Sequence, residues 1–278
     1  PRSNVDDQMD YPAPGRVERR AVRGDESARA GRLWWDGAAD AYQAEHGDFL
    51  RDVGFVWSPE GVDEADVRLL GDLDGERVLE IGCGAGQCGR WLRARGVREV
   101  VGFDLAWRQL QHSRRIDEQT GYRLPAVQAD AQRMPFAADS FDVVFSSFGA
   151  FPFVPAAETA LVEAARVLRP GGRFVFSVTH PIRWCFPDDP TVHGMTVRQS
   201  YFDRRAYVEE DDEGRAVYVE HHHTVGDWLR GIVAAGLELR DMVEPEWPEE
   251  NDQVWGGWGP ERGRMIPGTA IFSAVKPG

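Results

Sequence analysis

The stretch VLEIGCGAGQ (78–87) decides the fold that this sequence predicts. An apolar segment typical of a buried strand leads into three glycines at alternate positions, Gly82, Gly84 and Gly86. Glycine lets the backbone turn sharply and approach a ligand closely, and the N-terminus of a following helix offers free N–H groups. The stretch therefore predicts a strand, a ligand-binding turn and a helix.

Three carboxylates lie near the carboxyl ends of predicted strands, where open α/β sheets bind ligands. Glu80 precedes the first glycine, Asp104 ends the strand 99–104, and Asp130 follows the strand 126–129. Asp104 lies about 20 residues beyond the turn, where an acid accepts hydrogen bonds from ribose hydroxyls. Asp130 is placed to accept an adenine amino proton. For Glu80 and Asp130 the alternative is a helix cap or a solvent-exposed side chain.

Gln87 separates this turn from the dinucleotide fingerprint, which needs a third glycine at that position. The carboxylate of Glu80 would also repel a pyrophosphate, whereas it suits a ligand that carries a cation. The turn therefore predicts a nucleotide-like ligand with a positive charge.

Strand and helix patterns alternate from residue 77 to residue 178, and two further strands follow near 237–243 and 269–275. This pattern favours an α/β fold with a doubly wound, mostly parallel sheet of seven strands. Ser58 and Pro59 predict the start of a helix that ends near Gly71. We divide the chain into five segments. They are a mobile arm (1–26), a helical cover (27–71), the core (72–180), an inserted loop with an antiparallel hairpin (181–224) and a final segment that completes the sheet (225–278).

The composition excludes several classes of partner. The formal net charge of -14 gives no electrostatic footprint for nucleic acid. No apolar run approaches the ~20 residues that span a bilayer, so no membrane partner is expected. The cysteines Cys83, Cys88 and Cys185 lack CxxC spacing, which argues against a cysteine zinc site. A sparse, odd set of cysteines fits a reducing cytoplasm.

The chain resembles the class I S-adenosylmethionine (SAM)-dependent methyltransferases, in the group that includes ubiquinone C-methyltransferases and many small-molecule methyltransferases. SAM carries a sulfonium and an ammonium, in agreement with the acids around the turn. The resemblance covers roughly residues 75–180 and rests on VLEIGCGAGQ (78–87), Asp104, QADAQRMPFAADSFDVVFSSF (128–148) and LRPGGRFVFS (168–177).

The resemblance implies SAM as cofactor and S-adenosylhomocysteine as product. It also implies that an aromatic residue of the N-terminal helix, here Tyr42, closes over the cofactor; ordinary core packing is the alternative for Tyr42. The predicted cofactor-binding residues are Tyr42, Glu80, Gly82, Gly84, Gln87, Asp104, Leu105, Asp130, Ala131, Ser146 and Ser147.

The histidines are candidates for the chemistry of the methyl acceptor. His180 follows the fifth core strand, where it would act as a general base or bind substrate, or else simply precede a rigid proline turn. His221 and His223 share one face of a predicted strand; we expect His223 to be catalytic and His221 to bind substrate. No metal is predicted, because no further ligand has suitable spacing.

Trp184, Trp247, Trp255 and Trp258 lie in predicted loops and are expected to wall an apolar acceptor pocket, or else to fix the loop 244–268 to the body. Glu246 beside Trp247 would meet a cationic acceptor.

The predicted reaction is methyl transfer from SAM to a small metabolite. Methylation of a peptide or RNA, and SAM binding without catalysis, are the alternatives. The sequence makes no prediction of oligomeric state.

Overall fold

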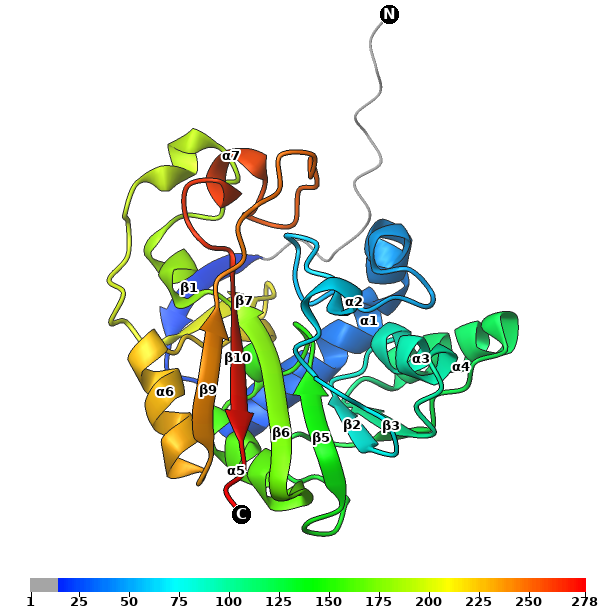
Figure 1. Ribbon diagram of the computed structural model, residues 1–278. Coiled ribbons are helices and arrows are strands. Elements are labelled where there is room, and N and C mark those ends of the chain that lie inside the picture. Colours follow the sequence, from blue (N-terminus) through cyan, green and yellow to red (C-terminus); the bar gives the residue numbers. More distant parts are fainter. Residues whose placement is uncertain (1–14) are drawn as a thin grey trace, which may run out of the picture.

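The computed structural model describes residues 15–278, and its main body is a sheet with the order β4-β3-β2-β5-β6-β10-β9 (Figure 1). Strands β2 to β6 run parallel, and β10 is antiparallel to both of its neighbours. This confirms the predicted seven-stranded, mostly parallel sheet. Its strands are β2 Arg77–Ile81, β3 Glu99–Asp104, β4 Ala126–Gln128, β5 Phe141–Ser146, β6 Leu168–Thr179, β9 Glu238–Val243 and β10 Thr269–Val275.

Both faces of the sheet are buried, each against its own apolar core. Along β2, the side chain of Val78 belongs to one core and that of Leu79 to the other, as expected when successive residues point to opposite faces. Helices α3 and α4 pack on the first face, and α5 and α6 pack on the second. Their bounds are α3 Gln87–Ala94, α4 Trp107–Thr120, α5 Ala157–Val167 and α6 Val225–Ala234.

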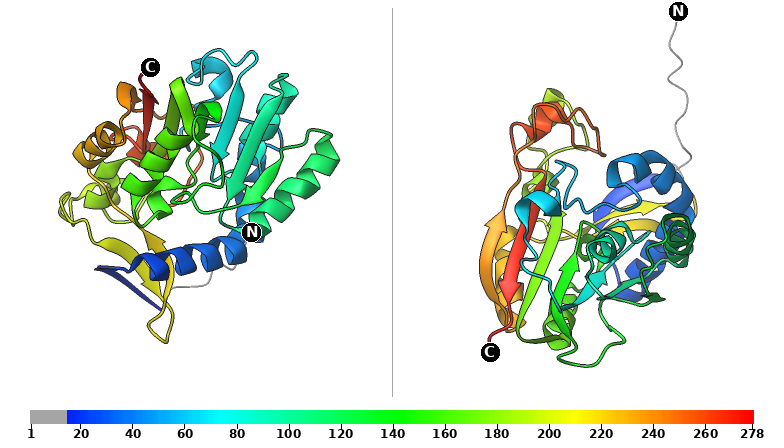
Figure 2. Two further views of the ribbon diagram at one scale, coloured as in Figure 1. Left: turned by 90° about the horizontal axis from the view of Figure 1, so that it is seen from below. Right: turned by 45° about the vertical axis from the view of Figure 1, so that its right-hand side comes forward.

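A second, three-stranded sheet lies beside the long helix α1 (Gly24–Leu50), as Figure 2 shows. In it β7 (Ala206–Glu210) pairs with both β8 (Ala216–Glu220) and β1 (Arg16–Arg20). The predicted hairpin exists, but it builds this separate sheet with a strand from the segment expected to be a mobile arm. Residues 1–14 of that arm lie outside the described residues.

Helix α1 is one continuous helix at the start of the predicted helical cover. It has 27 residues, yet neither it nor any other helix in the described part of the chain is apolar enough to cross a membrane.

The helix predicted from Ser58 is wrong, and a buried carboxylate explains why. Only α2 (Glu64–Val67) is helical here, and its cap is Asp63, whose Oδ1 accepts a hydrogen bond from the N–H of Ala65. The carboxylate of Glu64 accepts hydrogen bonds from the Trp57 indole and from the backbone N–H groups of residues 69 and 70. These bonds hold the segment as a loop. The remaining short helices are α7 Pro260–Gly263 and the 3-10 helices Phe151–Phe153, Pro181–Cys185 and Val192–Met195.

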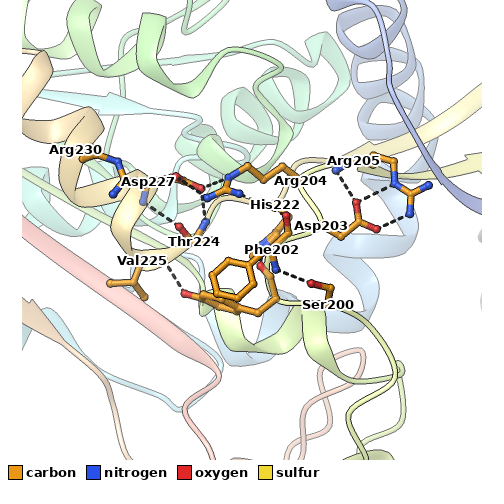
Figure 3. Close-up of polar contacts among 11 residues, drawn as sticks. Ser200, Phe202, Asp203, Arg204, Arg205, His222, Thr224, Val225, Asp227 and Arg230 are labelled. Atoms are coloured by element: carbon orange, nitrogen blue, oxygen red, sulfur yellow. Dashed lines mark hydrogen bonds and ion pairs between the residues drawn. The ribbon is translucent and has the colours of Figure 1, made fainter.

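The N-terminus of α6 is fixed to the inserted segment by a polar network around Asp227 (Figure 3). The Thr224 hydroxyl accepts from the N–H of Asp227 at 3.1 Å, and the Asp227 carboxylate accepts from the N–H of Thr224 at 2.9 Å, which is a capping box. Arg204 and Arg230 donate to the same carboxylate. Burial raises the pKa of Asp227, but these hydrogen bonds outweigh it and hold the pKa well below its usual range.

Replacing Asp227 with asparagine should lower the free energy of unfolding at pH 7 by about 1 kcal/mol, the usual value of a helix cap. Because the pKa is depressed in the folded state, this contribution is present above the unfolded pKa of about 3.9 and is lost as the pH falls through the folded value. Urea unfolding should therefore show a difference between variant and wild type that shrinks below about pH 4. Asp241→Asn, at an exposed position of β9, is the matched control. A difference that stays constant with pH would contradict this assignment.

Candidate functional site

A large cavity opens above the turn that follows β2. It contains about 1300 Å³ of space, part of it open to solvent. The ends of the core strands form its floor, while α1, the 3-10 helix 151–153 and Trp255 cover it. The predicted cofactor residues that line it are Tyr42, Glu80, Gly82, Gly84, Gln87, Asp104, Leu105, Asp130, Ala131 and Ser147.

The glycine turn has the backbone geometry that only glycine adopts easily. Gly82, Gly84 and Gly86 have φ values of 66°, 52° and 80°, in the left-handed region where a side chain is strained. A Cβ at Gly82 would lie 2.9 Å from the Cβ of Ala150. The turn therefore leaves bare backbone at the cavity, with α3 starting immediately behind it.

Asp104 ends β3 beside this turn, and its carboxylate ties the two together. One oxygen accepts from the N–H of Gly84 and the other from the N–H of Ala106, both at 2.8 Å. Burial raises the pKa of Asp104, and these two hydrogen bonds oppose the shift. The carboxylate faces the cavity and retains lone pairs for the hydroxyls of a bound ribose.

Glu80 lies at the base of the cavity and is only 3% exposed. Burial raises its pKa to about 8, although the nearby guanidinium of Arg90 opposes the shift. Among the described residues, its Oε2 has no hydrogen-bond partner. A cationic group bound at the turn would favour the ionised carboxylate.

Another part of the cavity lining is formed by Asp130, Ala131 and Leu105. Asp130 follows β4, and its Oδ1 accepts from the N–H of Gln132 at 2.8 Å. Ala131 and Leu105 provide the apolar surface that a flat base needs, and the carboxylate provides an acceptor for its amino group. This arrangement fits the adenine of SAM.

Of the two serines predicted at the end of β5, the structure brings one to the cavity. Ser147 lines the cavity and donates to the carbonyl of Val56 at 2.7 Å, whereas Ser146 is fully buried and does not line it. The next residue, Phe148, has a φ of 58°. A bulky residue in this conformation is strained, and its N–H is fixed by the Ser177 hydroxyl at 2.7 Å. No sequence signal marked Phe148 as strained.

Three glutamines join α1 to the helices behind the glycine turn. The amide of Gln87 donates to that of Gln43 at 3.3 Å, and Gln43 donates to Gln109 at 3.2 Å. All three line the cavity. Only Gln87 was predicted, because the spacing around the turn drew attention to it alone.

The two histidines predicted to be catalytic lie outside the cavity lining. His180 accepts from the N–H of Ile182 through Nδ1, and its Nε2 lies 2.9 Å from Glu244. His223 packs on the ring of Trp228, with 4.7 Å between ring centroids. Burial lowers the pKa of both histidines. Both positions serve the packing of neighbouring elements.

Four of the predicted acceptor residues, Trp184, His221, Glu246 and Trp247, also lie outside the cavity lining. Trp184 packs against Tyr207 and His222, and Trp247 donates to the carbonyl of Asn251 at 2.7 Å. Neither lines the cavity, and Glu246 is exposed outside it. His221 does not line the cavity itself, but its Nε2 lies 2.8 Å from the hydroxyl of Ser27, a cavity residue on α1.

The aromatic residue of the late loop that reaches the cavity is Trp255. It stacks on His46 of α1 at 3.8 Å between ring centroids and meets Tyr42 and Phe49 edge to face. Its loop carries several tryptophans with no pattern to rank them, so the sequence did not distinguish Trp255 from Trp247.

Known proteins are similar to this chain mainly in the core. Residues 79–176 match the family model described as a methyltransferase domain. A fatty-acid O-methyltransferase of Mycolicibacterium smegmatis is 39% identical over 42% of this chain and 42% of its own length. A demethylmenaquinone methyltransferase of Thermus thermophilus is 36% identical over 46% of this chain and 56% of its own. The chain spans about half the length of these curated relatives.

A solved structure is similar over a longer stretch. The structure of a putative SAM-dependent methyltransferase from Listeria monocytogenes matches with a TM-score of 0.63 and 23% identity, over 76% of this chain and 96% of that one. At this identity the likeness concerns the fold, and it extends beyond the segment that matches the family model.

Gly86→Ala should destabilise the protein more than Gly96→Ala. Both glycines have a left-handed φ, 80° and 88°, so both variants carry the usual strain of roughly 1–2 kcal/mol. Only at Gly86 would the added Cβ also collide, at 2.5 Å from the Ser113 hydroxyl and 2.9 Å from Arg90. Urea unfolding should show the larger loss for Gly86→Ala, and equal losses would contradict the tight packing behind the turn.

Proposed function

We propose that this chain, which belongs to the class I SAM-dependent methyltransferases, transfers the methyl group of SAM to a small-molecule acceptor. The observation that carries the proposal is the cavity that runs from Asp130 past the glycine turn to Trp255. Its lining combines the acids and glycines that suit SAM with aromatic side chains such as Trp35, Phe153 and Trp255. A lining of two such parts suits a cofactor together with a second, apolar molecule.

The residues along one side of the cavity fit SAM part by part. Asp130 and Ala131 suit the adenine, and Asp104 suits the ribose hydroxyls. The turn at Gly82 and Gly84 presents bare backbone to the amino-acid part. The orphaned Oε2 of Glu80 suits a nearby cation. None of these cofactor residues comes from the inserted segment 181–224.

The bound cofactor supplies a methyl group that is already activated by its positively charged sulfur, so the protein's main tasks are alignment and exclusion of water. Helix α1 performs both tasks, because Tyr42 and Gln43 cover the cavity opposite the strand ends. The strained backbone at Phe148 holds its ring within 6.2 Å of Trp255 across the covered space. These rings keep an acceptor in an apolar, shielded environment.

A small acceptor agrees better with the structure than a macromolecule does. The cavity is covered by α1 and Trp255, and the net charge of -14 opposes RNA binding. SAM binding without catalysis is disfavoured, because the cavity extends beyond the cofactor residues to Trp35, Phe153 and Trp255. We also propose a cytoplasmic location, supported by three cysteines that are all free and buried.

Asp104→Ala should weaken SAM binding at least tenfold, because it removes a charged acceptor worth about 1.5–3 kcal/mol per hydrogen bond. Isothermal calorimetry on the full chain measures the affinity directly. The exposed Asp252→Ala is the control and should bind like the wild type. Unchanged affinity in Asp104→Ala, or no SAM binding by the wild type, would remove the basis of the proposed function.

A further inference from the structure

The part of the cavity beyond the cofactor residues is walled by aromatic rings. Trp35 and Phe153 meet at 5.1 Å between centroids, Trp35 and Tyr42 at 5.5 Å, and Phe49 and Trp255 at 5.7 Å. Aromatic pairs at such distances form rigid walls that favour flat, apolar ligands. The rings that line this part are Trp35, Tyr42, Phe49, Phe148, Phe153 and Trp255.

The charges around the cavity exclude one class of acceptor. Its ionisable acids are Glu80, Asp104 and Asp130, and none of its lining residues within 15–278 is a lysine, arginine or histidine. A buried anion without a positive partner is costly. An acceptor that must enter as a carboxylate or phosphate would therefore be disfavoured, whereas a neutral molecule would not.

One polar pair interrupts the apolar wall. Ser27 of α1 is only 1% exposed, and its hydroxyl lies 2.8 Å from Nε2 of His221. His221 follows β8, and its backbone N–H donates to the carbonyl of Pro152 at 2.7 Å. The pair therefore links three segments that close over the cavity: α1, the 3-10 helix 151–153 and the three-stranded sheet.

His221 is suited to hold Ser27 in place and is a poor proton acceptor. Burial, together with the neighbouring His223, lowers the pKa of His221 to about 4. The imidazole is therefore neutral at physiological pH, far from the pKa near 7 that serves a general base. A neutral imidazole either donates a hydrogen bond to the serine hydroxyl or accepts one from it. The hydroxyl then keeps a donor or an acceptor available for a ligand.

We propose that Ser27, oriented by His221, hydrogen-bonds a hydroxyl group of a neutral aromatic acceptor that lies between the rings of the cavity. This inference rests on the proposed function and specifies the acceptor class of the same site. Ser27 is the residue that contacts the acceptor, and His221 is a positioning residue. A ligand hydroxyl both donates and accepts, so it matches Ser27 whichever tautomer His221 adopts.

The test compares two probes of the same shape, 2-naphthol and naphthalene, with the full chain saturated with S-adenosylhomocysteine. Fluorescence titration should show that wild type binds 2-naphthol more tightly than naphthalene. In Ser27→Ala the dissociation constant of 2-naphthol should rise about tenfold, the scale of one hydrogen bond, and that of naphthalene should stay unchanged. The ratio of the two affinities is insensitive to a general loss of fold.

The positioning role of His221 has its own variants. His221→Leu should reduce the preference for 2-naphthol as Ser27→Ala does, whereas His221→Gln should restore much of it, because a glutamine amide reaches the position of Nε2. His193→Ala, at an exposed histidine outside the cavity, is the control and should keep the wild-type preference.

The inference is overturned if wild type binds the two probes equally, or if Ser27→Ala weakens both to the same extent. Calorimetry with SAM separates this failure from that of the proposed function. A chain that binds SAM but shows no preference dependent on Ser27 retains the methyltransferase proposal and loses only the acceptor class.

Discussion

The left-handed turn between β2 and α3 is the constraint on which the rest of the site depends. Its glycines let the backbone come within contact of Ala150 and Ser113, where any side chain would collide. Arg90 is fully buried behind it and donates to the carbonyls of Ala85 and Asp52. Arg90 thus fixes the turn on the side away from the cavity, and the glycines present bare backbone on the side that faces it. Asp104 can bridge to it only because β3 lies beside β2 and ends at the same edge of the sheet.

The other half of the cavity is built by segments that are far apart in the chain. Helix α1 crosses the edge of the main sheet, and the three-stranded sheet packs along α1 (Figure 2). The contact between Ser27 and His221 joins residues 194 positions apart. The local sequence of a strand, a turn and a helix therefore explains the cofactor side of the cavity, whereas the acceptor side depends on long-range packing.

This division explains how much the sequence could predict. The sequence pattern was sufficient to predict the core sheet and most of the residues that line the cavity near the glycine turn, because glycine spacing and strand-end acids act within one βαβ unit. It failed for β1, whose polar sequence pairs only when β7 is present, and at Ser58, where the buried carboxylate of Glu64 prevents a helix. The placement of His180 and the role of Trp255 depend on loops that carry no periodic signal. His221 was predicted, but its partner Ser27 was not.

Hydrogen–deuterium exchange with and without S-adenosylhomocysteine tests the central claim most directly, because it maps the binding site on the unmodified chain. The account predicts slower exchange in peptides that contain the turn 82–87, the strand ends at 104–106 and 130–132, and the covering helix α1. The distant β9 should exchange at the same rate in both samples. Protection absent from the turn and from residues 104–106, or confined to other parts of the chain, would contradict the account.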